Sequence, residues 1–196
     1  MRIIYDIIFS TLSLKEKLMK YLKYMGAFAI FFALNGCSGV NPQTAQVIDS
    51  PVEGLEYQCA GLVKYTDSNG IAICEHMPMG FKVGEIIFGL VKKVPADGII
   101  VPQDMVGVSR DNLEDENVKK IVVILQSLDE DQNPENGIKI TPEVREKLDI
   151  FIDIKTTSLE DIKELIEAQL GEAIFKDEEE AIEHLKKSMK KYNILP

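Results

Sequence analysis

The sequence predicts an α+β fold, in which a small antiparallel β-sandwich is followed by packed C-terminal helices. Residues 51–110 contain short runs rich in β-branched and aromatic residues, with turn signals about every 8 to 12 residues, as in a sandwich or barrel. From residue 111 to residue 196, apolar residues recur at helical spacing with capping signals at the ends. Because the strands precede the helices and do not alternate with them, the pattern favours α+β over a βαβ sheet.

Residues 19–36, MKYLKYMGAFAIFFALNG, predict a secretory signal peptide ahead of this domain. Lys20 and Lys23 give a positive start, and Met25–Leu34 is an uncharged apolar run of ten residues. Such a run is too short for a spanning helix, which needs about 20 residues, but it suits the core of a signal peptide. We therefore expect Met19 to be the true start.

Residues 1–18 fit poorly ahead of such a signal, since Asp6 and Glu16 are unusual in its positive region. We interpret residues 1–18 as a start-site artefact. An N-terminal tail in front of a signal anchor is the alternative interpretation.

The apolar run ends in Leu34-Asn35-Gly36-Cys37, which resembles the lipobox of bacterial lipoproteins. In such proteins the signal is cut before the cysteine, its thiol is diacylated and its new amine is acylated. Three acyl chains anchor firmly, because burial gives about 0.8 kcal/mol per CH₂ and one chain alone is marginal. Ser38 stands where an Asp would resemble an inner-membrane retention signal. We thus expect a lipid anchor at Cys37 in the outer membrane of a Gram-negative bacterium; an uncleaved anchor with a chance cysteine is the alternative.

Residues 37–50 are polar and lack periodicity, which predicts a flexible tether between the bilayer and the domain. Residues 1–36 hold five of the 22 basic and two of the 32 acidic residues, so the chain from Cys37 onward carries a net charge of −13. So acidic a surface repels phosphate backbones and makes nucleic acid a poor partner. The lipid bilayer is expected as a partner only through the acylated cysteine.

In the β-rich part, two strand-like runs flank Asp67-Ser68-Asn69-Gly70, a sequence typical of tight turns. We expect a hairpin here, in a sandwich of transthyretin-like or Ig-like type. Cys59 and Cys74 lie on either side of this turn. Two cysteines in an exported chain predict a disulfide between them, with two free thiols as the alternative. Further along, Pro102 indicates an edge strand or a strand end.

Helices are expected in the second part. Residues 112–129 place apolar residues at helical spacing, with acids in the first turns. Thr141-Pro142 supplies an N-cap and an N1 proline for another helix. Ser158 caps a further helix that ends at Gly171. Residues 176–193 begin with acids and close with lysines, which matches a helix dipole.

Residues 51 to about 189 resemble a module of secreted and outer-membrane proteins of Gram-negative bacteria, sometimes repeated in adhesin-like chains. The most specific part is residues 117–140, NVKKIVVILQSLDEDQNPENGIKI, which resembles N-I-x-x-L-L-Q-S-L-D-x-D-x-x-P-x-N-G-I. TDSNGIAIC (66–74) and IIVPQDMVG (99–107) resemble its hairpin and its V-T-P-x-D-L-V-G segment. The resemblance implies a β-rich surface module with helices, and it brings no known activity.

The acidic loop, residues 129–137, carries Asp129, Asp131, Asn133 and Glu135 at alternate positions after a helix. This matches the first half of an EF-hand loop, in which Glu135 would offer its backbone carbonyl. However, position 6 is a proline where glycine is required, and position 12 is an isoleucine where a bidentate glutamate is required. Two interpretations stay open: a calcium (Ca²⁺) site with its own geometry, or a helix-ending turn whose acids bond loop amides.

The string CEHMPM, Cys74–Met79, offers soft and borderline ligands that suit Cu(I). A copper site would use His76, Met77 and Met79, although methionine on a sheet more often fills the core. The other histidine, His184, is expected at the surface among lysines. The sequence carries no motif for nucleophilic or metal-dependent catalysis, so we expect a protein that is not an enzyme.

These observations together predict a lipid-anchored structural or binding module of the cell envelope, with an envelope protein or surface ligand as its partner. A calcium-stabilised adhesive module and a periplasmic copper-binding protein are the two alternatives.

Overall fold

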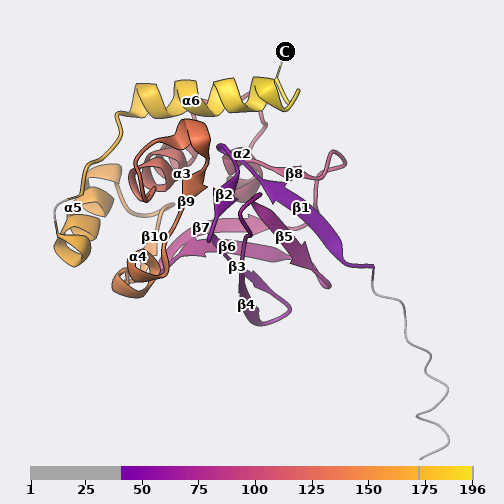
Figure 1. Cartoon of the computed structure of the whole chain (residues 1–196), viewed down its shortest axis with the longest axis horizontal. Helices are drawn as coiled ribbons and strands as arrows, with labels where there is room; N and C mark the ends of the chain where they lie inside the picture. Colours follow the sequence, from indigo (N-terminus) through magenta and orange to yellow (C-terminus); the bar gives the residue numbers. More distant parts are fainter. Residues whose placement is uncertain (1–40, 172, 196) are drawn as a thin grey trace, which may run out of the picture. The chain divides into compact units, whose positions relative to one another are not determined.

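Strands build most of the first half of the chain in the computed structural model, which describes residues 41–171 and 173–195 (Figure 1). They are β1 (Gln43–Val47), β2 (Val52–Glu53), β3 (Glu56–Cys59), β4 (Leu62–Tyr65), β5 (Ile71–Cys74), β6 (Met79–Val83), β7 (Ile86–Val91) and β8 (Ile99–Ile100), joined later by β9 (Ile138–Lys139) and β10 (Ile152–Asp153). A five-stranded sheet has the order β10-β7-β6-β3-β4, a three-stranded sheet has the order β5-β1-β8, and β2 pairs with β9. The predicted start site, signal peptide and lipidated Cys37 lie outside the described residues.

The helices are α2 (Pro102–Val106), α3 (Glu116–Ser127), the 3₁₀ turn η1 (Pro134–Asn136), α4 (Pro142–Lys147), α5 (Leu159–Leu170) and α6 (Glu178–Lys191). The predicted caps are confirmed: Thr141 accepts from the Val144 N–H, and Ser158 accepts from the Asp161 N–H. Pro102 begins α2 at its N1 position, where the missing N–H costs no bond. The predicted α+β class, with mostly antiparallel sheets followed by helices, is confirmed.

The predicted tether is wrong over its second half. Gln43–Val47 forms β1, the central strand of the three-stranded sheet, antiparallel to β5 and parallel to β8. Ala45 and Val47 point into the core while Thr44 is exposed, so the segment alternates as a strand should. Five residues with only two apolar side chains gave too weak a period to be recognised as a strand.

The predicted hairpin at residues 67–70 is also wrong, because β4 and β5 belong to different sheets. The turn itself forms: the Asp67 side chain accepts from the Asn69 and Ile71 N–H groups, and Gly70 has φ +74°. It carries the chain from the five-stranded to the three-stranded sheet. The actual hairpin joins β3 to β4 through Ala60 and Gly61, both at positive φ, as in a type I′ turn.

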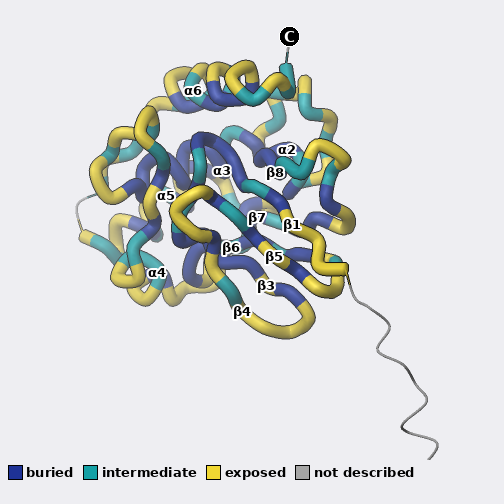
Figure 2. The backbone as a smooth tube through the Cα atoms, turned by 45° about the vertical axis from the view of Figure 1, so that its right-hand side comes forward, coloured by how far each residue is buried: buried dark blue, intermediate teal, exposed yellow. Residues whose placement is uncertain are grey.

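The core runs without a break between the predicted β-rich and helical parts, so residues 41–196 make one compact unit. Helix α3 is almost wholly buried (Figure 2). Its Ile121, Ile124 and Leu125 pack with the sheet residues, whereas Val118 and Val122 pack with residues of α6. α3 therefore fixes the position of α6 above the sheets and of the loop that follows it (Figure 1). Among the described residues no helix combines the length and the apolar character that crossing a membrane requires.

Candidate functional site

The acidic loop begins where α3 ends and is closed by contacts between its two ends. The Glu130 N–H donates to the Lys139 carbonyl at 3.0 Å, and the Lys139 N–H donates to Asp129 Oδ1 at 2.8 Å. Within the loop, Asp131 Oδ1 accepts from the Asn133 N–H at 3.0 Å, and Asp131 Oδ2 accepts from Asn136 Nδ2 at 2.8 Å. The loop is therefore a fixed turn, with two of its carboxylates directed inward.

Asp129 is buried, with 5% of its surface exposed, although it is an aspartate in an acidic loop. Its Oδ2 has no hydrogen-bond partner among the described residues. Burial raises the pKa of Asp129, and the adjoining Asp131 carboxylate raises it further, whereas the Lys139 N–H opposes the shift. An unpartnered buried polar atom costs about 1–3 kcal/mol, so this oxygen calls for a ligand or a proton.

A hollow of about 190 Å³ lies beside the acidic loop, and Asp129 is one of its lining residues. Its lining comes from three parts of the chain: Glu53 of β2, Ser68 of the turn after β4, and the acidic loop with Asp129, Asp131 and Asn136. The parallel pairing of β2 with β9 brings them together, since Glu53 lies opposite Lys139 in the register.

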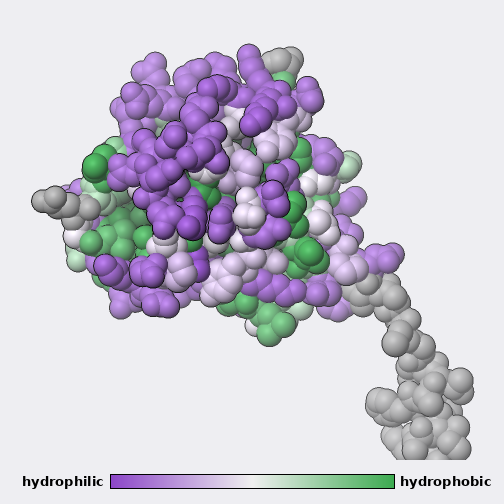
Figure 3. Space-filling view, viewed as in Figure 1, coloured by the Kyte–Doolittle hydropathy of each residue, from purple (hydrophilic) through white to green (hydrophobic). Residues whose placement is uncertain are grey.

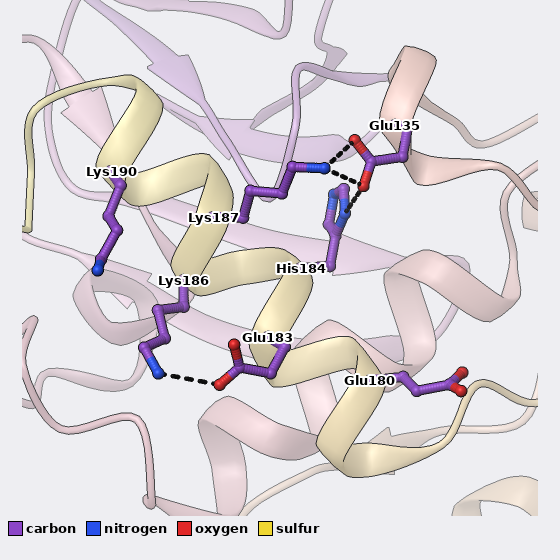
Figure 4. A pocket seen from close by; sticks show the side chains of 7 residues that line it. All are labelled: Glu135, Glu180, Glu183, His184, Lys186, Lys187 and Lys190. Carbon is purple, nitrogen blue, oxygen red and sulfur yellow. Dashed lines mark hydrogen bonds and ion pairs between the residues drawn. The ribbon is translucent and has the colours of Figure 1, made fainter.

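Glu135, the last of the predicted calcium ligands, directs its side chain toward α6 (Figure 4). Its carboxylate accepts from Lys187 Nζ at 2.7 and 2.8 Å and lies 3.6 Å from His184 Nδ1. The contact with Lys187 lowers the pKa of Glu135. These residues line a broad surface hollow over α6, whose face is largely hydrophilic (Figure 3). The side chain of Asn133 is not part of either hollow's lining.

His184 is not the surface residue that the sequence predicted, because its side chain is only 9% exposed. Its Nε2 lies 2.9 Å from the Asp49 carbonyl oxygen and 3.1 Å from Ser50 Oγ. Burial lowers its pKa, and the bond to Asp49 opposes that shift. A carbonyl oxygen only accepts, so Nε2 carries the proton and cannot take one from the Ser50 hydroxyl. The Ser50–His184–Glu135 arrangement thus links three segments, the turn after β1, α6 and the acidic loop, and does not activate a nucleophile.

Asp49 completes this buried polar cluster. It is fully buried, and its Oδ2 accepts from Gln126 Nε2 at 2.8 Å, while Oδ1 has no partner among the described residues. Burial raises its pKa well above the usual value. Gln126 also donates to the Ala181 carbonyl at 3.0 Å, so one amide of α3 joins the turn after β1 to α6. No sequence signal singles out Asp49, Ser50 or Gln126, because the first two lie in the predicted tether and the third lies in an apolar helix.

The predicted disulfide between Cys59 and Cys74 is present. Cys59 ends β3 of the five-stranded sheet, and Cys74 ends β5 of the three-stranded sheet, so the bond joins the two sheets. Both cysteines are buried. The bond closes a segment that includes β4 and the turn at residues 67–70, and a loop of this size typically adds about 3 kcal/mol of stability.

The string CEHMPM does not present three ligands together at the surface. Met79 is fully buried in β6, Met77 packs against the same core, and His76 is exposed. Cys74 is used by the disulfide. In the part of the chain that the structure describes, no three His, Cys, Asp or Glu side chains are grouped as a metal site. A copper site at these residues therefore has no support from the fold.

A scan against protein-family models, a search of curated proteins and a search of solved structures found no match to this chain.

Proposed function

We propose that this protein is a non-enzymatic structural or binding module of the cell envelope, anchored by lipid at Cys37 to the outer membrane of a Gram-negative bacterium. The observation that carries the proposal is the Cys59–Cys74 disulfide between the two sheets. Such bonds persist in oxidising compartments outside the cytoplasm. Together with the lipobox-like Leu34-Asn35-Gly36-Cys37, it argues for export followed by acylation.

The position of the domain agrees with an anchored module. β1 begins at Gln43, a few residues after Cys37. A short connection would hold the domain close to the bilayer surface, where its negative charge favours facing away from anionic headgroups. The partner would be an envelope protein or a surface ligand.

The non-enzymatic part of the proposal rests on how the Ser50–His184 pair is bonded. A hydrolase would need a histidine nitrogen free to accept the serine proton. Here that nitrogen donates to the Asp49 carbonyl, and Ser50 itself is 7% exposed.

Metabolic labelling with a palmitate analogue tests the anchor. The full chain, expressed in a Gram-negative host, should take up label and fractionate with the outer membrane. Cys37→Ser should lose both properties, while Ser38→Asp should keep the label and move the protein to the inner membrane. The pair Cys59→Ser with Cys74→Ser is the matched control, since it removes cysteines but should keep the label. Equal labelling of Cys37→Ser, or a cytoplasmic protein with free thiols, would contradict the proposal.

A further inference from the structure

The hollow beside the acidic loop holds more negative charge than its neighbours neutralise. Four acids line it, Glu53, Asp129, Glu130 and Asp131, and one lysine, Lys139. Lys139 Nζ is already engaged by Glu130 Oε2 at 2.7 Å. Glu53, Asp129 and Asp131 are therefore left without a cationic partner in the lining.

The two central carboxylates are held in place before any ligand arrives. Asp129 is fixed by the Lys139 N–H, and Asp131 is fixed by the Asn133 N–H and the Asn136 side chain. Asp129 Oδ1 and the two carboxylate oxygens of Asp131 thus each accept one hydrogen bond. Asp129 Oδ2 accepts none from the described residues. Since a carboxylate oxygen has about two acceptor positions, each of these atoms can still bind a cation.

We propose that this hollow is a calcium site, in which the carboxylates of Asp129 and Asp131 are the two charged ligands. The neutral ligands would come from the Asn136 side-chain oxygen, the Ser68 hydroxyl and water, with Glu53 at the rim. The site joins β2, the turn at residues 67–70 and the acidic loop, so bound calcium would tie the strands to the segment after α3.

The ligand set selects calcium among common ions. Carboxylate, amide and hydroxyl oxygens suit hard cations, and no histidine or cysteine lines the hollow to favour zinc or copper. Calcium accepts six to eight oxygens in irregular geometry, whereas magnesium requires a near-ideal octahedron. With two charged ligands, the affinity should lie in the range of about 10⁻⁴ to 10⁻³ M that is typical of extracellular modules.

This site differs from an EF-hand at Glu135, whose backbone carbonyl would be a ligand in an EF-hand loop. Glu135 is absent from the lining of the hollow, and its carboxylate pairs with Lys187 on α6. Asp131→Asn and Glu135→Gln thus form a matched pair: each removes one negative charge from the same loop, at an exposed residue, and only the first removes a proposed ligand.

Thermal unfolding of residues 38–196, which contain the whole compact unit, tests the proposal. At fixed ionic strength, 10 mM CaCl₂ should raise the midpoint by about 3–5 °C if the Kd is near 1 mM. Magnesium should have a clearly smaller effect. The rise should be lost in Asp131→Asn and kept in Glu135→Gln. Calorimetric titration of the unsubstituted chain should give one calcium per chain, a readout that needs no variant to fold.

Three results would contradict the proposed calcium site. Superimposable curves with and without calcium would mean that none binds. An unchanged calcium response in Asp131→Asn would place the ion elsewhere. If Asp131→Asn raises the midpoint without calcium and neither chain responds to the ion, the two carboxyls share a proton and the hollow holds no cation.

Discussion

Asp49 and Asp129 are two buried aspartates, each with one oxygen bonded and one without a partner among the described residues, but their surroundings differ. Asp49 lies inside the fold and lines neither the hollow over α6 nor the hollow beside the acidic loop. Its carboxyl is bonded to the neutral amide of Gln126. Asp129 borders a hollow that also contains Asp131.

The difference shows two ways in which the charge of a buried carboxyl can be removed or balanced. A carboxyl in a closed site becomes neutral by binding a proton, since a buried charge without a counter-ion is costly. A carboxyl beside a second carboxylate and an accessible space can bind a cation instead. The same residue type is thus a buried acid in the interior of the fold at Asp49 and, in the site that we propose, a calcium ligand at Asp129.

The largest effect is expected from Gln126→Ala. This change removes the donor to Asp49 Oδ2 and to the Ala181 carbonyl, leaving both buried acceptors without this bond. We expect a loss of about 2–3 kcal/mol in the free energy of unfolding, measured in urea. Gln46→Ala is the control, because Gln46 donates to the exposed Asn69 carbonyl and its removal should have little effect. Equal losses of unfolding free energy in the two variants would show that the buried hydrogen bonds of Gln126 contribute no more stability than an exposed one.

Asp49→Asn should remove the part of the pH dependence of the free energy of unfolding that comes from Asp49. The folded pKa of Asp49 is raised, so its contribution to stability is complete below the ordinary Asp pKa of about 4 and is lost as pH rises through the folded value. The unsubstituted chain should therefore lose stability with rising pH by about 1 kcal/mol or more relative to the variant. Urea midpoints from pH 4 to 8 measure this. Parallel profiles for the two chains would mean that Asp49 stays charged.

His184 should give a pH dependence of stability with the opposite sign. Its folded pKa is lowered, so its contribution is present above the ordinary His value of about 6.5 and is lost as pH falls through the folded pKa. His184→Gln should flatten the dependence of unfolding stability on pH between about pH 7 and 5. We expect this change in stability to be smaller than the change caused by Asp49→Asn. His76→Gln makes the same substitution at an exposed position and is the matched control.

The smallest effect is expected from Glu135→Gln. Its partner Lys187 and Glu135 itself are both more than half exposed, at 67% and 56% of their side chains. Exposed ion pairs contribute little and are screened by salt. The unfolding midpoint should change only slightly at low salt and not at all in 0.5 M NaCl. A large shift that persists in salt would show that this pair has a structural role beyond charge.

Features set by local chemistry could be predicted from the sequence. The N-caps at Thr141 and Ser158 and the buried stripe of α3 follow from residue type and spacing within one turn or helix. The disulfide followed from cysteine count and compartment. What could not be predicted depends on contacts between distant segments: β1 is a strand because β5 and β8 lie beside it.

The candidate site shows the same division. Asp129 and Asp131 were identified from their spacing, but the sequence could not show that Glu135 faces α6 or that Glu53 and Ser68 reach the hollow. Those positions depend on the pairing of β2 with β9, which joins residues far apart in the chain.

The measurement with the greatest weight is the calcium-induced shift of the unfolding midpoint, compared between Asp49→Asn and Asp131→Asn at neutral pH. Both variants replace a carboxyl by an amide. If Asp49 binds a proton and the Asp129–Asp131 pair binds calcium, Asp49→Asn keeps the full shift and Asp131→Asn loses it. An equal shift in both variants, or no shift in the unsubstituted chain, would contradict this assignment of the two buried acids.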